Sequence, residues 1–369
     1  MKIGTLTFSY SSNPGSVLQA YALQETILGI EGVSECNIIN YQKHRADKPI
    51  IGKNVFCGPI WQWTPGKVAK WIRRMIAFPL RMRKYEKFFS GYYRNFAKKP
   101  YSRNELAALE AEYDRFVVGS DQVWNLDSPN VDHTYFLDFV GESAKKVAYA
   151  ASFGRKGLPE QDKEAIGRLI ADFAAISVRE KDGVAAVKDA AGREAEWVLD
   201  PSLLRTREQW ESMAVRPAEQ NYVFVYLREE SPRIDAFAER LAREKNLQVI
   251  KVMTHWKCGR DGRRRSAVGP REWLGYMQHA SYVVTNSFHG ICFSIALEKQ
   301  MYVDLLKGNR ADTNPRMASL MNLFGLAERC VSEDAVLAEA EVDFAQVNTV
   351  LEAWRRKSLD YLTRAIRGE

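Results

Sequence analysis

Short apolar runs alternate along the chain with segments whose apolar residues recur at helical spacing. The runs predict two series of β-strands, one on each side of residues 200–219. Strands that alternate with helices form parallel sheets covered on both faces, so the pattern predicts an α/β fold with two Rossmann-like sheets. The predicted strands are Ile3–Phe8, Cys36–Tyr41, Arg115–Gly119, Val147–Ala151, Ala174–Val178, Trp197–Leu199, Tyr222–Leu227, Leu247–Met253, Tyr282–Thr285 and Met301–Leu305.

Helices are expected between these strands and at the end of the chain. The clearest is Ser231–Lys245, where Ser231 is a suitable cap and Pro232 suits the first turn. A second is Pro270–Ala280, and a third covers about Phe344–Arg367. We therefore expect an N-terminal domain over 1–205, a C-terminal domain over 206–345, and a last helix over 346–369 that packs back across the hinge.

The net charge of +7 on 369 residues comes from one segment. Residues 67–99 hold eleven Lys and Arg and a single acid, Glu86, which leaves 42 basic and 45 acidic residues elsewhere. Aromatic residues are interleaved with this charge, and Pro79 is expected to break or kink any helix there. The pattern is typical of a helical insertion, about 61–100, that packs on the N-terminal domain. Contact with an anionic membrane surface is the second interpretation, and no nucleic-acid motif supports a third.

Several absences restrict the class of protein. No apolar run is long enough to cross a bilayer, and the first residues read as a strand rather than a signal peptide. The five cysteines show no metal-binding or disulfide spacing, so no metal site is expected. We expect a cytoplasmic protein, peripheral at the inner face of the membrane if the basic segment binds lipid.

Candidate chemistry gathers in loops that follow a strand and precede a helix. Ser11–Ser16 offers small residues near a helix N-terminus, an arrangement suited to an anion. Ser120, Asp121 and Gln122 follow a buried strand and are expected to face a cleft between the two sheets.

Two further loops carry the residue types that bind and protonate anions. Arg179 directly follows a strand, and its planar guanidinium suits a carboxylate or phosphate. His289, between Ser287 and Gly290, stands where a strand ends and a helix begins. An imidazole at that place can donate to an anion or act as a general acid or base.

Taken together, these loops resemble the polysaccharide pyruvyl transferase family. The resemblance runs in order from about residue 1 to residue 325, and its specificity comes from seven motifs in register. These motifs are Asn13-x-Gly15-x-x-Leu18-Gln19-Ala20-x-Ala22-Leu23, Gly119-Ser120-Asp121-Gln122-x-Trp124-Asn125, Ser152-Phe153-Gly154, Ser177-Val178-Arg179-Glu180, Asp200-Pro201, Gly269-Pro270-x-Glu272-Trp273-Leu274 and Ser287-Phe288-His289-Gly290.

The resemblance implies a glycosyltransferase-B-like fold, with two Rossmann-like domains facing across a cleft. It also implies that pyruvate moves from phosphoenolpyruvate to two sugar hydroxyls as a cyclic ketal. The acceptor would be a glycan precursor of capsule, exopolysaccharide or cell wall, linked to a lipid or a nucleotide. Phosphoenolpyruvate is then a donor substrate, and no cofactor is expected.

The resemblance also assigns roles to residues. Arg179 would hold the donor's phosphate or carboxylate, His289 would be the acid or a phosphate ligand, and Asp121 would be a base. Family members carry a basic residue some twenty positions after the histidine; Lys307, Arg310 and Arg316 are candidates here, and Arg310 is preferred. The donor set is Arg179, Ser287, His289, Gly290 and Arg310, and the acceptor set is Asn13, Gly15, Gln19, Ser120, Gln122 and Trp124.

Other functions remain open at this stage. The same fold serves glycosyltransferases that use nucleotide sugars, and fold does not fix function. A non-catalytic glycan-binding protein would tolerate the loss of Arg179 or His289, yet both are present. Pro14 departs from the aromatic residue commoner at that place in the family, which affects the expected acceptor contacts more than the fold.

Overall fold

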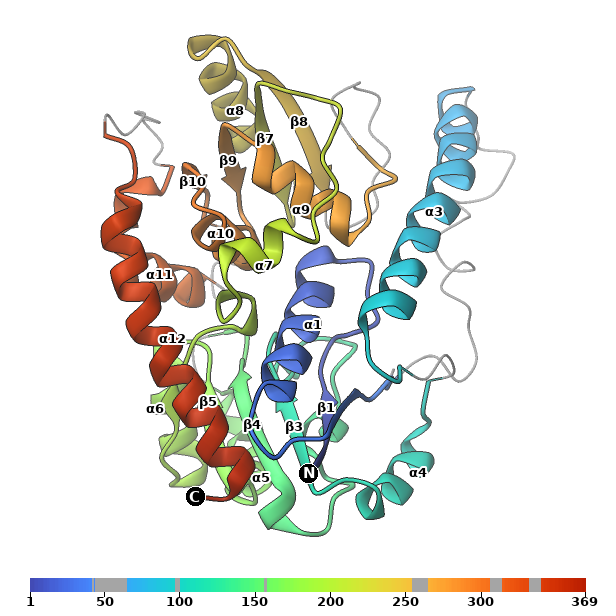
Figure 1. The fold of residues 1–369 in the computed structure, drawn as a ribbon, viewed down its shortest axis with the longest axis vertical. Helices are drawn as coiled ribbons and strands as arrows, with labels where there is room; N and C mark the ends of the chain where they lie inside the picture. Colours follow the sequence, from blue (N-terminus) through green and yellow to red (C-terminus); the bar gives the residue numbers. More distant parts are fainter. Residues whose placement is uncertain are drawn as a thin grey trace.

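Two parallel β-sheets form the framework of the protein (Figure 1). The computed structural model describes residues 1–41, 43, 65–96, 100–155, 158–253, 265–305, 314–331 and 340–369. All registered strand pairs in both sheets are parallel. The α/β class predicted from the sequence is therefore confirmed.

The first sheet has six strands in the order β2-β1-β3-β4-β5-β6. Strand β4 is buried at every position, and β1 and β3 are buried after their first residue, as expected for a parallel sheet covered by helices. The bounds are β1 (Lys2–Leu6), β2 (Glu35–Ile38), β3 (Arg115–Gly119), β4 (Lys146–Ala151), β5 (Ala175–Val178) and β6 (Glu196–Trp197).

The second sheet has four strands in the order β10-β9-β7-β8. Its bounds are β7 (Tyr222–Leu227), β8 (Gln248–Met253), β9 (Tyr282–Thr285) and β10 (Met301–Val303). Every strand predicted from the apolar runs is present, with ends that differ by a few residues. The boundary that we expect after residue 205 falls between β6 and β7, and the division into domains stays a prediction.

Strand order reverses direction at one place in each sheet. The chain moves outward from β1 to β2 and returns to β3 on the other side of β1; β7, β8 and β9 repeat this arrangement. In open α/β sheets, ligands bind beyond the carboxyl ends of the strands at such a switch point. The topology therefore points to the loops after β1 and β3 and after β7 and β9.

Helices connect and cover the strands (Figure 1). In α8 the predicted cap is observed, since the Ser231 hydroxyl accepts from the Ile234 amide at 3.3 Å and Pro232 is the first helical residue. The helices are α1 (Pro14–Leu28), α3 (Pro65–Tyr92), α4 (Arg103–Leu106), α5 (Glu160–Ala171), α6 (Lys181–Ala191), α7 (Arg207–Glu211), α8 (Pro232–Glu244), α9 (Pro270–His279), α10 (Phe288–Ala296), α11 (Asn314–Leu323) and α12 (Phe344–Arg367).

Of the two effects expected of Pro79, a break or a kink, helix α3 excludes the break. The helix continues through Pro79 as one element of 28 residues. Its second half is held by packing, because Tyr85, Phe88 and Phe89 are buried in the main hydrophobic core. Tertiary packing supplies most of the stability of a protein helix and here outweighs the hydrogen bond that proline cannot make.

Helix α12 returns from the second sheet to the first (Figure 1). Near its end, the Tyr361 hydroxyl donates to the carbonyl of Ala148 in β4 at 2.8 Å. One turn earlier, the Ser358 hydroxyl accepts from the Leu199 amide at 3.0 Å. The last described helix is thus part of the packing of the first sheet.

Candidate active site

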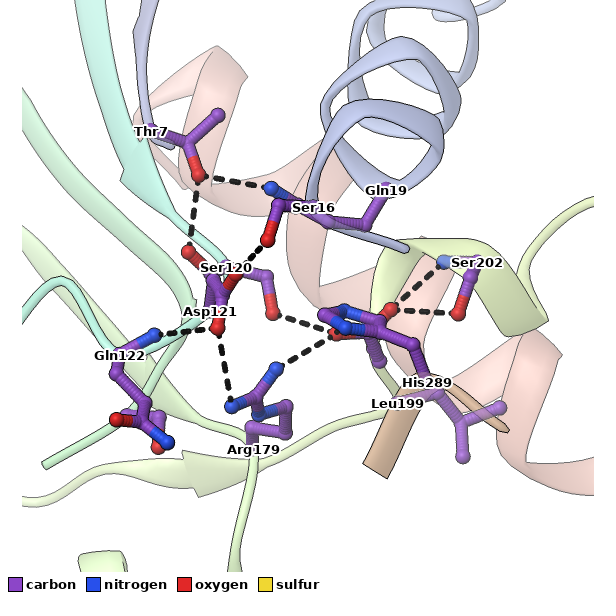
Figure 2. Close-up of polar contacts among 12 residues, drawn as sticks. Thr7, Ser16, Gln19, Ser120, Asp121, Gln122, Arg179, Leu199, Ser202 and His289 are labelled. Carbon is purple, nitrogen blue, oxygen red and sulfur yellow. Dashed lines mark hydrogen bonds and ion pairs between the residues drawn. The ribbon is translucent and has the colours of Figure 1, made fainter. Parts of the chain in front are cut away.

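The loops at both switch points meet in one polar cluster. Ser120 and Asp121 follow β3, Arg179 follows β5, and His289 lies in the first turn of α10, which follows β9. All four side chains are buried. Figure 2 shows Ser16, Asp121 and Arg179 reaching toward one another, with His289 at the side of the group. The sequence therefore identified the correct loops as neighbours.

Asp200 is the centre of this cluster. One carboxylate oxygen, Oδ2, accepts from the Ser120 hydroxyl at 2.8 Å and from Nη1 of Arg179 at 3.1 Å. The same oxygen lies 3.7 Å from Nε2 of His289. The other oxygen, Oδ1, accepts from the Ser202 amide at 3.0 Å and hydroxyl at 2.6 Å. One buried carboxylate thus orients groups from both sheets.

The charge of Asp200 is strongly favoured. Burial by itself would raise the pKa of this carboxyl group. The adjacent His289 and Arg179 side chains and the Ser202 hydrogen bond outweigh burial and hold the pKa far below its ordinary value. Asp200 is therefore ionised at any pH at which the protein would work.

Asp121 is a second anchored carboxylate. Its backbone is left-handed, with φ of 69°, a conformation that Asp tolerates better than most residues. The Ser16 hydroxyl donates to Oδ2 at 2.6 Å, and Nη2 of Arg179 lies 3.7 Å from Oδ1. Burial opposes the ionisation of Asp121, yet the charges of His289 and Arg179 and the hydrogen bond from Ser16 lower its pKa. An ionised Asp121 accepts protons only weakly until a substrate changes its surroundings.

Three arginines, Arg179, Arg228 and Arg316, bring positive charge close together in the cluster. The Arg179 guanidinium stacks 4.1 Å from the ring centroid of Phe288, and Arg316 of α11 approaches the same ring at 6.0 Å. Burial and the charges of Arg228 and Arg179 lower the pKa of Arg316 to about 9. Arg316 is therefore charged at neutral pH, in surroundings that a bound anion would relieve.

Gln122 joins these guanidinium groups. With its amide oxygen facing them, it accepts from Arg316 Nη2 at 2.7 Å and from Arg228 Nη1 at 3.1 Å. Gln122 was predicted to bind the acceptor. Its contacts place it beside the arginines, and its role toward the acceptor stays a prediction.

Several buried polar atoms of the cluster have no hydrogen-bond partner among the described residues. They include Nε and Nη2 of Arg179, Nε of Arg316 and Nε2 of His289. Oε2 of Glu180 also has no hydrogen-bond partner among the described residues. Burial raises the pKa of Glu180, although Arg179 and the hydrogen bond from Ser152 act in the opposite direction. Buried nitrogen atoms normally have hydrogen-bond partners, so unpartnered nitrogens on two neighbouring guanidinium groups and an adjacent imidazole indicate a site for an anion.

The segments that follow β1 contact the second half of the chain inside the site. A Cβ atom at Gly15 would lie only 2.5 Å from the Cβ atom of His289, so glycine allows α1 to meet α10. The Tyr226 hydroxyl, at the end of β7, donates to Asn13 Oδ1 at 3.0 Å. The same Asn13 oxygen caps α1 through the Gly15 amide at 3.1 Å. Asn13 and Gly15, predicted to bind the acceptor, therefore also connect the two halves of the site.

The remaining predicted donor residues lie at the start of α10. Ser287 is its N-cap residue, and the Ser287 amide donates to Thr285 Oγ1 at 3.1 Å. A Cβ atom at Gly290 would lie 2.2 Å from the same oxygen, so this turn requires glycine. Arg310 and Lys307 lie outside the described residues. Arg316, the third candidate, is the basic residue that the structure brings to the cluster.

Two predicted acceptor residues are buried and hydrogen-bonded within the protein. Gln19 is fully buried, and its amide donates to Thr7 Oγ1 at 2.9 Å. Trp124 is 1% exposed and stacks on Phe136, and its indole N–H donates to the Tyr135 carbonyl at 3.1 Å. The ring of Trp124 is therefore part of the core, and its contact with the acceptor stays a prediction.

We expect Trp124→Phe to lower stability and to leave ligand binding unchanged. The change removes the indole donor and leaves the buried Tyr135 carbonyl without this hydrogen bond, at a cost of about 1–3 kcal/mol. Urea unfolding monitored by circular dichroism measures the loss. If donor affinity falls while stability stays at the wild-type value, Trp124 contributes to ligand binding.

The main residue that the sequence interpretation missed is Asp200. It was noted only as part of an Asp-Pro motif, and the available signal was that this motif directly follows the last strand of the first sheet. Tyr226 and Arg228, at the end of β7, were also missed.

In the described ranges, no three His, Cys, Asp or Glu side chains are grouped to hold a metal ion. Nor does any helix in these ranges have the length and apolarity to span a bilayer.

Solved structures offer only distant similarity. A UDP-GlcNAc 2-epimerase from Neisseria meningitidis bound to UDP-GlcNAc is 11% identical, with 100% of this chain and 98% of that chain covered and a TM-score of 0.47. MnaA of S. aureus with UDP is 9% identical, with 95% of each chain covered and a TM-score of 0.47. The wall teichoic acid polymerase TagF is 10% identical, with 78% of this chain and 84% of that chain covered and a TM-score of 0.40. Similarity at this level carries no argument about ligands.

The sequence itself gives the decisive comparison. No curated protein matches the chain. The family model for polysaccharide pyruvyl transferase matches residues 13–303, a range that contains Asn13, Asp121, Arg179, Asp200 and His289. This match covers every strand of both sheets except β1, and it ends before α11 and Arg316. The chain belongs to the polysaccharide pyruvyl transferase family.

Proposed function

We propose that the protein transfers pyruvate from phosphoenolpyruvate to two hydroxyls of a glycan precursor of capsule, exopolysaccharide or cell wall. The observation that carries this proposal is the buried cluster of Arg179, Arg316 and His289, in which each residue has at least one donor atom without a partner among the described residues. Phosphoenolpyruvate brings a phosphate and a carboxylate on a small carbon frame. Guanidinium groups bind both anions through paired hydrogen bonds, and the N-terminus of α10 adds a favourable dipole.

The chemistry requires two proton movements and one leaving group. The methylene carbon of the donor gains a proton and becomes a methyl group, while a sugar oxygen bonds to the neighbouring carbon. The second sugar oxygen then bonds to this carbon as the C–O bond to phosphate breaks. One hydroxyl proton balances the new methyl group, and the other balances the released inorganic phosphate.

The residues suit these tasks. Arg179 and Arg316 would bind the donor's anionic groups and stabilise phosphate as it leaves. His289, held beside the Asp200 carboxylate at 3.7 Å, would move a proton to or from the reacting atoms. Asp121 lies beside Ser16 and Arg179 and would accept a hydroxyl proton once the acceptor is bound. Asp200 would act as a positioning residue for Arg179 and His289.

The first test measures donor binding by calorimetry. We expect phosphoenolpyruvate to bind the wild type, and Arg316→Gln or His289→Gln to weaken its affinity by about tenfold to a hundredfold, as the loss of a charge-assisted hydrogen bond predicts. Arg271→Gln is the matched control. Arg271 also lies near the second sheet, but its guanidinium donates to the Met213 carbonyl at 2.8 Å, away from the cluster.

Nucleotide sugars form the second arm of this experiment. Binding of a UDP- or GDP-sugar with no binding of phosphoenolpyruvate would replace the proposal by a nucleotide-sugar glycosyltransferase on the same fold. Equal phosphoenolpyruvate affinity in wild type, Arg316→Gln and His289→Gln would show that the donor does not bind at this cluster. Ketal formation on an acceptor glycan, with release of phosphate, is the positive end point.

A further inference from the structure

An apolar stripe on α3 is exposed to solvent. Seven large hydrophobic side chains are exposed in the part of the chain that the structure describes, and five of these belong to α3. The five side chains, which we call the α3 stripe, are Val68 (37% exposed), Ile72 (47%), Met75 (40%), Ile76 (61%) and Leu80 (44%).

The stripe lies on one face of the helix. Its positions follow one another at intervals of three or four residues, which is the spacing of residues on one side of a helix. Met75 and Ile76, which are adjacent in the sequence, are the exception. The second half of α3 packs on the body through Tyr85, Phe88 and Phe89, which are buried. Figure 1 shows α3 at the edge of the molecule, with its first half extending away from the first sheet.

The same segment carries strong positive charge. Residues 65–85 contain seven Lys and Arg and no Asp or Glu. By the 3.6-residue period, the positions of Lys67, Lys70, Arg73 and Arg74 fall outside the stripe. An apolar face combined with a cationic remainder is the pattern of a helix that lies in the interface of an anionic membrane.

We propose that the α3 stripe docks the protein onto the surface of a bilayer that contains anionic lipid. Apolar side chains would enter the acyl boundary, while Lys and Arg would contact the headgroups. A second copy of the chain would bring two such cationic segments together, and their repulsion opposes this pairing. A nucleic acid would satisfy the charge but leave the stripe exposed to water. The inference goes beyond the proposed reaction and does not depend on it.

The docking helix is attached to the candidate active site. The Arg81 guanidinium donates to the Ser12 carbonyl, and the Tyr85 hydroxyl donates to the same oxygen at 2.8 Å. The next residue, Asn13, caps α1 and bonds Tyr226 across the two sheets. A membrane-bound α3 would therefore hold the loop before α1 at a fixed distance from the lipid surface.

Flotation with vesicles tests the proposal. The vesicles are pure phosphatidylcholine, or phosphatidylcholine with 30% phosphatidylglycerol (about one anionic lipid in three). Two variants remove one feature each: Ile72→Ser/Ile76→Ser/Leu80→Ser removes the stripe, and Lys67→Gln/Lys70→Gln/Arg73→Gln/Arg74→Gln removes charge. We expect the wild type to float with the anionic vesicles only, and each variant to bind them at least about tenfold more weakly, given the contribution of each basic residue near such a surface.

Matched controls separate location from composition. Val215→Ser/Leu359→Ser replaces side chains that are each 37% exposed but lie outside α3. Arg243→Gln/Lys245→Gln/Arg356→Gln/Lys357→Gln removes the same number of charges from exposed positions of α8, its C-cap and α12. Both controls should float like the wild type. Circular dichroism checks that every variant is folded.

Three results would overturn the proposal. The first is wild-type flotation by the stripe variant, and the second is equal loss of flotation in the α3 charge variant and its control. The third is a wild type that does not bind the vesicles but forms a concentration-dependent dimer, seen by light scattering, which the stripe variant does not form. Phosphoenolpyruvate binding is measured in parallel, so that failure of the proposed reaction is distinguished from failure of membrane docking.

Discussion

Asp200→Asn is expected to destabilise the protein by about 3–5 kcal/mol, because it removes the charge partner of a buried arginine. Asp200 Oδ2 accepts from Arg179 at 3.1 Å, and both side chains are fully buried. Asparagine has nearly the same shape but leaves the Arg179 charge opposed mainly by the more distant Asp121. Urea unfolding at neutral pH measures the change in the free energy of unfolding.

The effect has a defined pH dependence. Because the folded protein holds the pKa of Asp200 below its unfolded value, the stabilisation is complete above the unfolded pKa, about 4. It decreases as the pH falls from there through the folded pKa. Wild type and Asp200→Asn should therefore differ most at neutral pH and approach each other only in strong acid.

Asp360→Asn is the matched control for this substitution. Asp360 pairs with Arg364 at 3.0 Å on the surface of α12, and its side chain is 68% exposed. An exposed pair of this kind contributes about 0–1 kcal/mol, so the control should unfold nearly like the wild type. Equal stability of the two variants would show that Asp200 does not act as the buried centre of the site.

Gly15→Ala is expected to damage the site through a single methyl group. A Cβ atom at this position would lie 2.5 Å from Cβ and 2.8 Å from Nδ1 of His289. Because α1 and α10 both meet at this point, the methyl group must displace His289 or push the two helices apart. Overpacking of this kind costs about 1–3 kcal/mol of stability. A displacement of His289 by about 1 Å would lower the catalytic rate by up to about a hundredfold.

The control for Gly15→Ala is the same substitution in another helix. Gly91 lies in α3, and a Cβ atom there would have no neighbour within 4 Å. Gly91→Ala should leave the protein as stable as the wild type or make it more stable, since alanine restricts the unfolded chain. Thermal unfolding and phosphoenolpyruvate binding are measured for both. A Gly15→Ala protein that behaves like Gly91→Ala would mean that α1 and α10 do not meet as described.

The sequence predicted most of the fold, because each apolar run corresponds to a strand and most of these strands are buried. Local signals were less reliable where packing over long distances decided the outcome. Pro79 was expected to break or kink α3, and the break is absent because Phe88 and Phe89 pack its second half on the core. Trp124 stood among polar neighbours in the sequence, but its ring entered the core beside Phe136.

The sequence predicted which loops form the site better than it predicted the contacts between their side chains. Arg179 and His289 follow strands, and parallel strands bring their carboxyl ends together. Asp200 reads as the cap of a turn, a role that Oδ1 does perform toward Ser202. Its second oxygen holds Arg179, a contact that no local pattern reveals. The bond between Asn13 and Tyr226 joins residues 213 positions apart, and a single sequence carries no signal for it.

The return of α12 to the first sheet has a consequence for protein synthesis. Domains commonly fold in order as the ribosome extends the chain. Here the Ala148 carbonyl in β4 receives its bond from Tyr361, and the Leu203 and Arg205 carbonyls accept from Arg355 at 2.6 and 2.7 Å. The face of the first sheet that α12 covers therefore stays uncovered until the second sheet and α12 have been translated. During that interval the apolar residues that later pack against Leu362 and Ile366 of α12 have no cover from this helix.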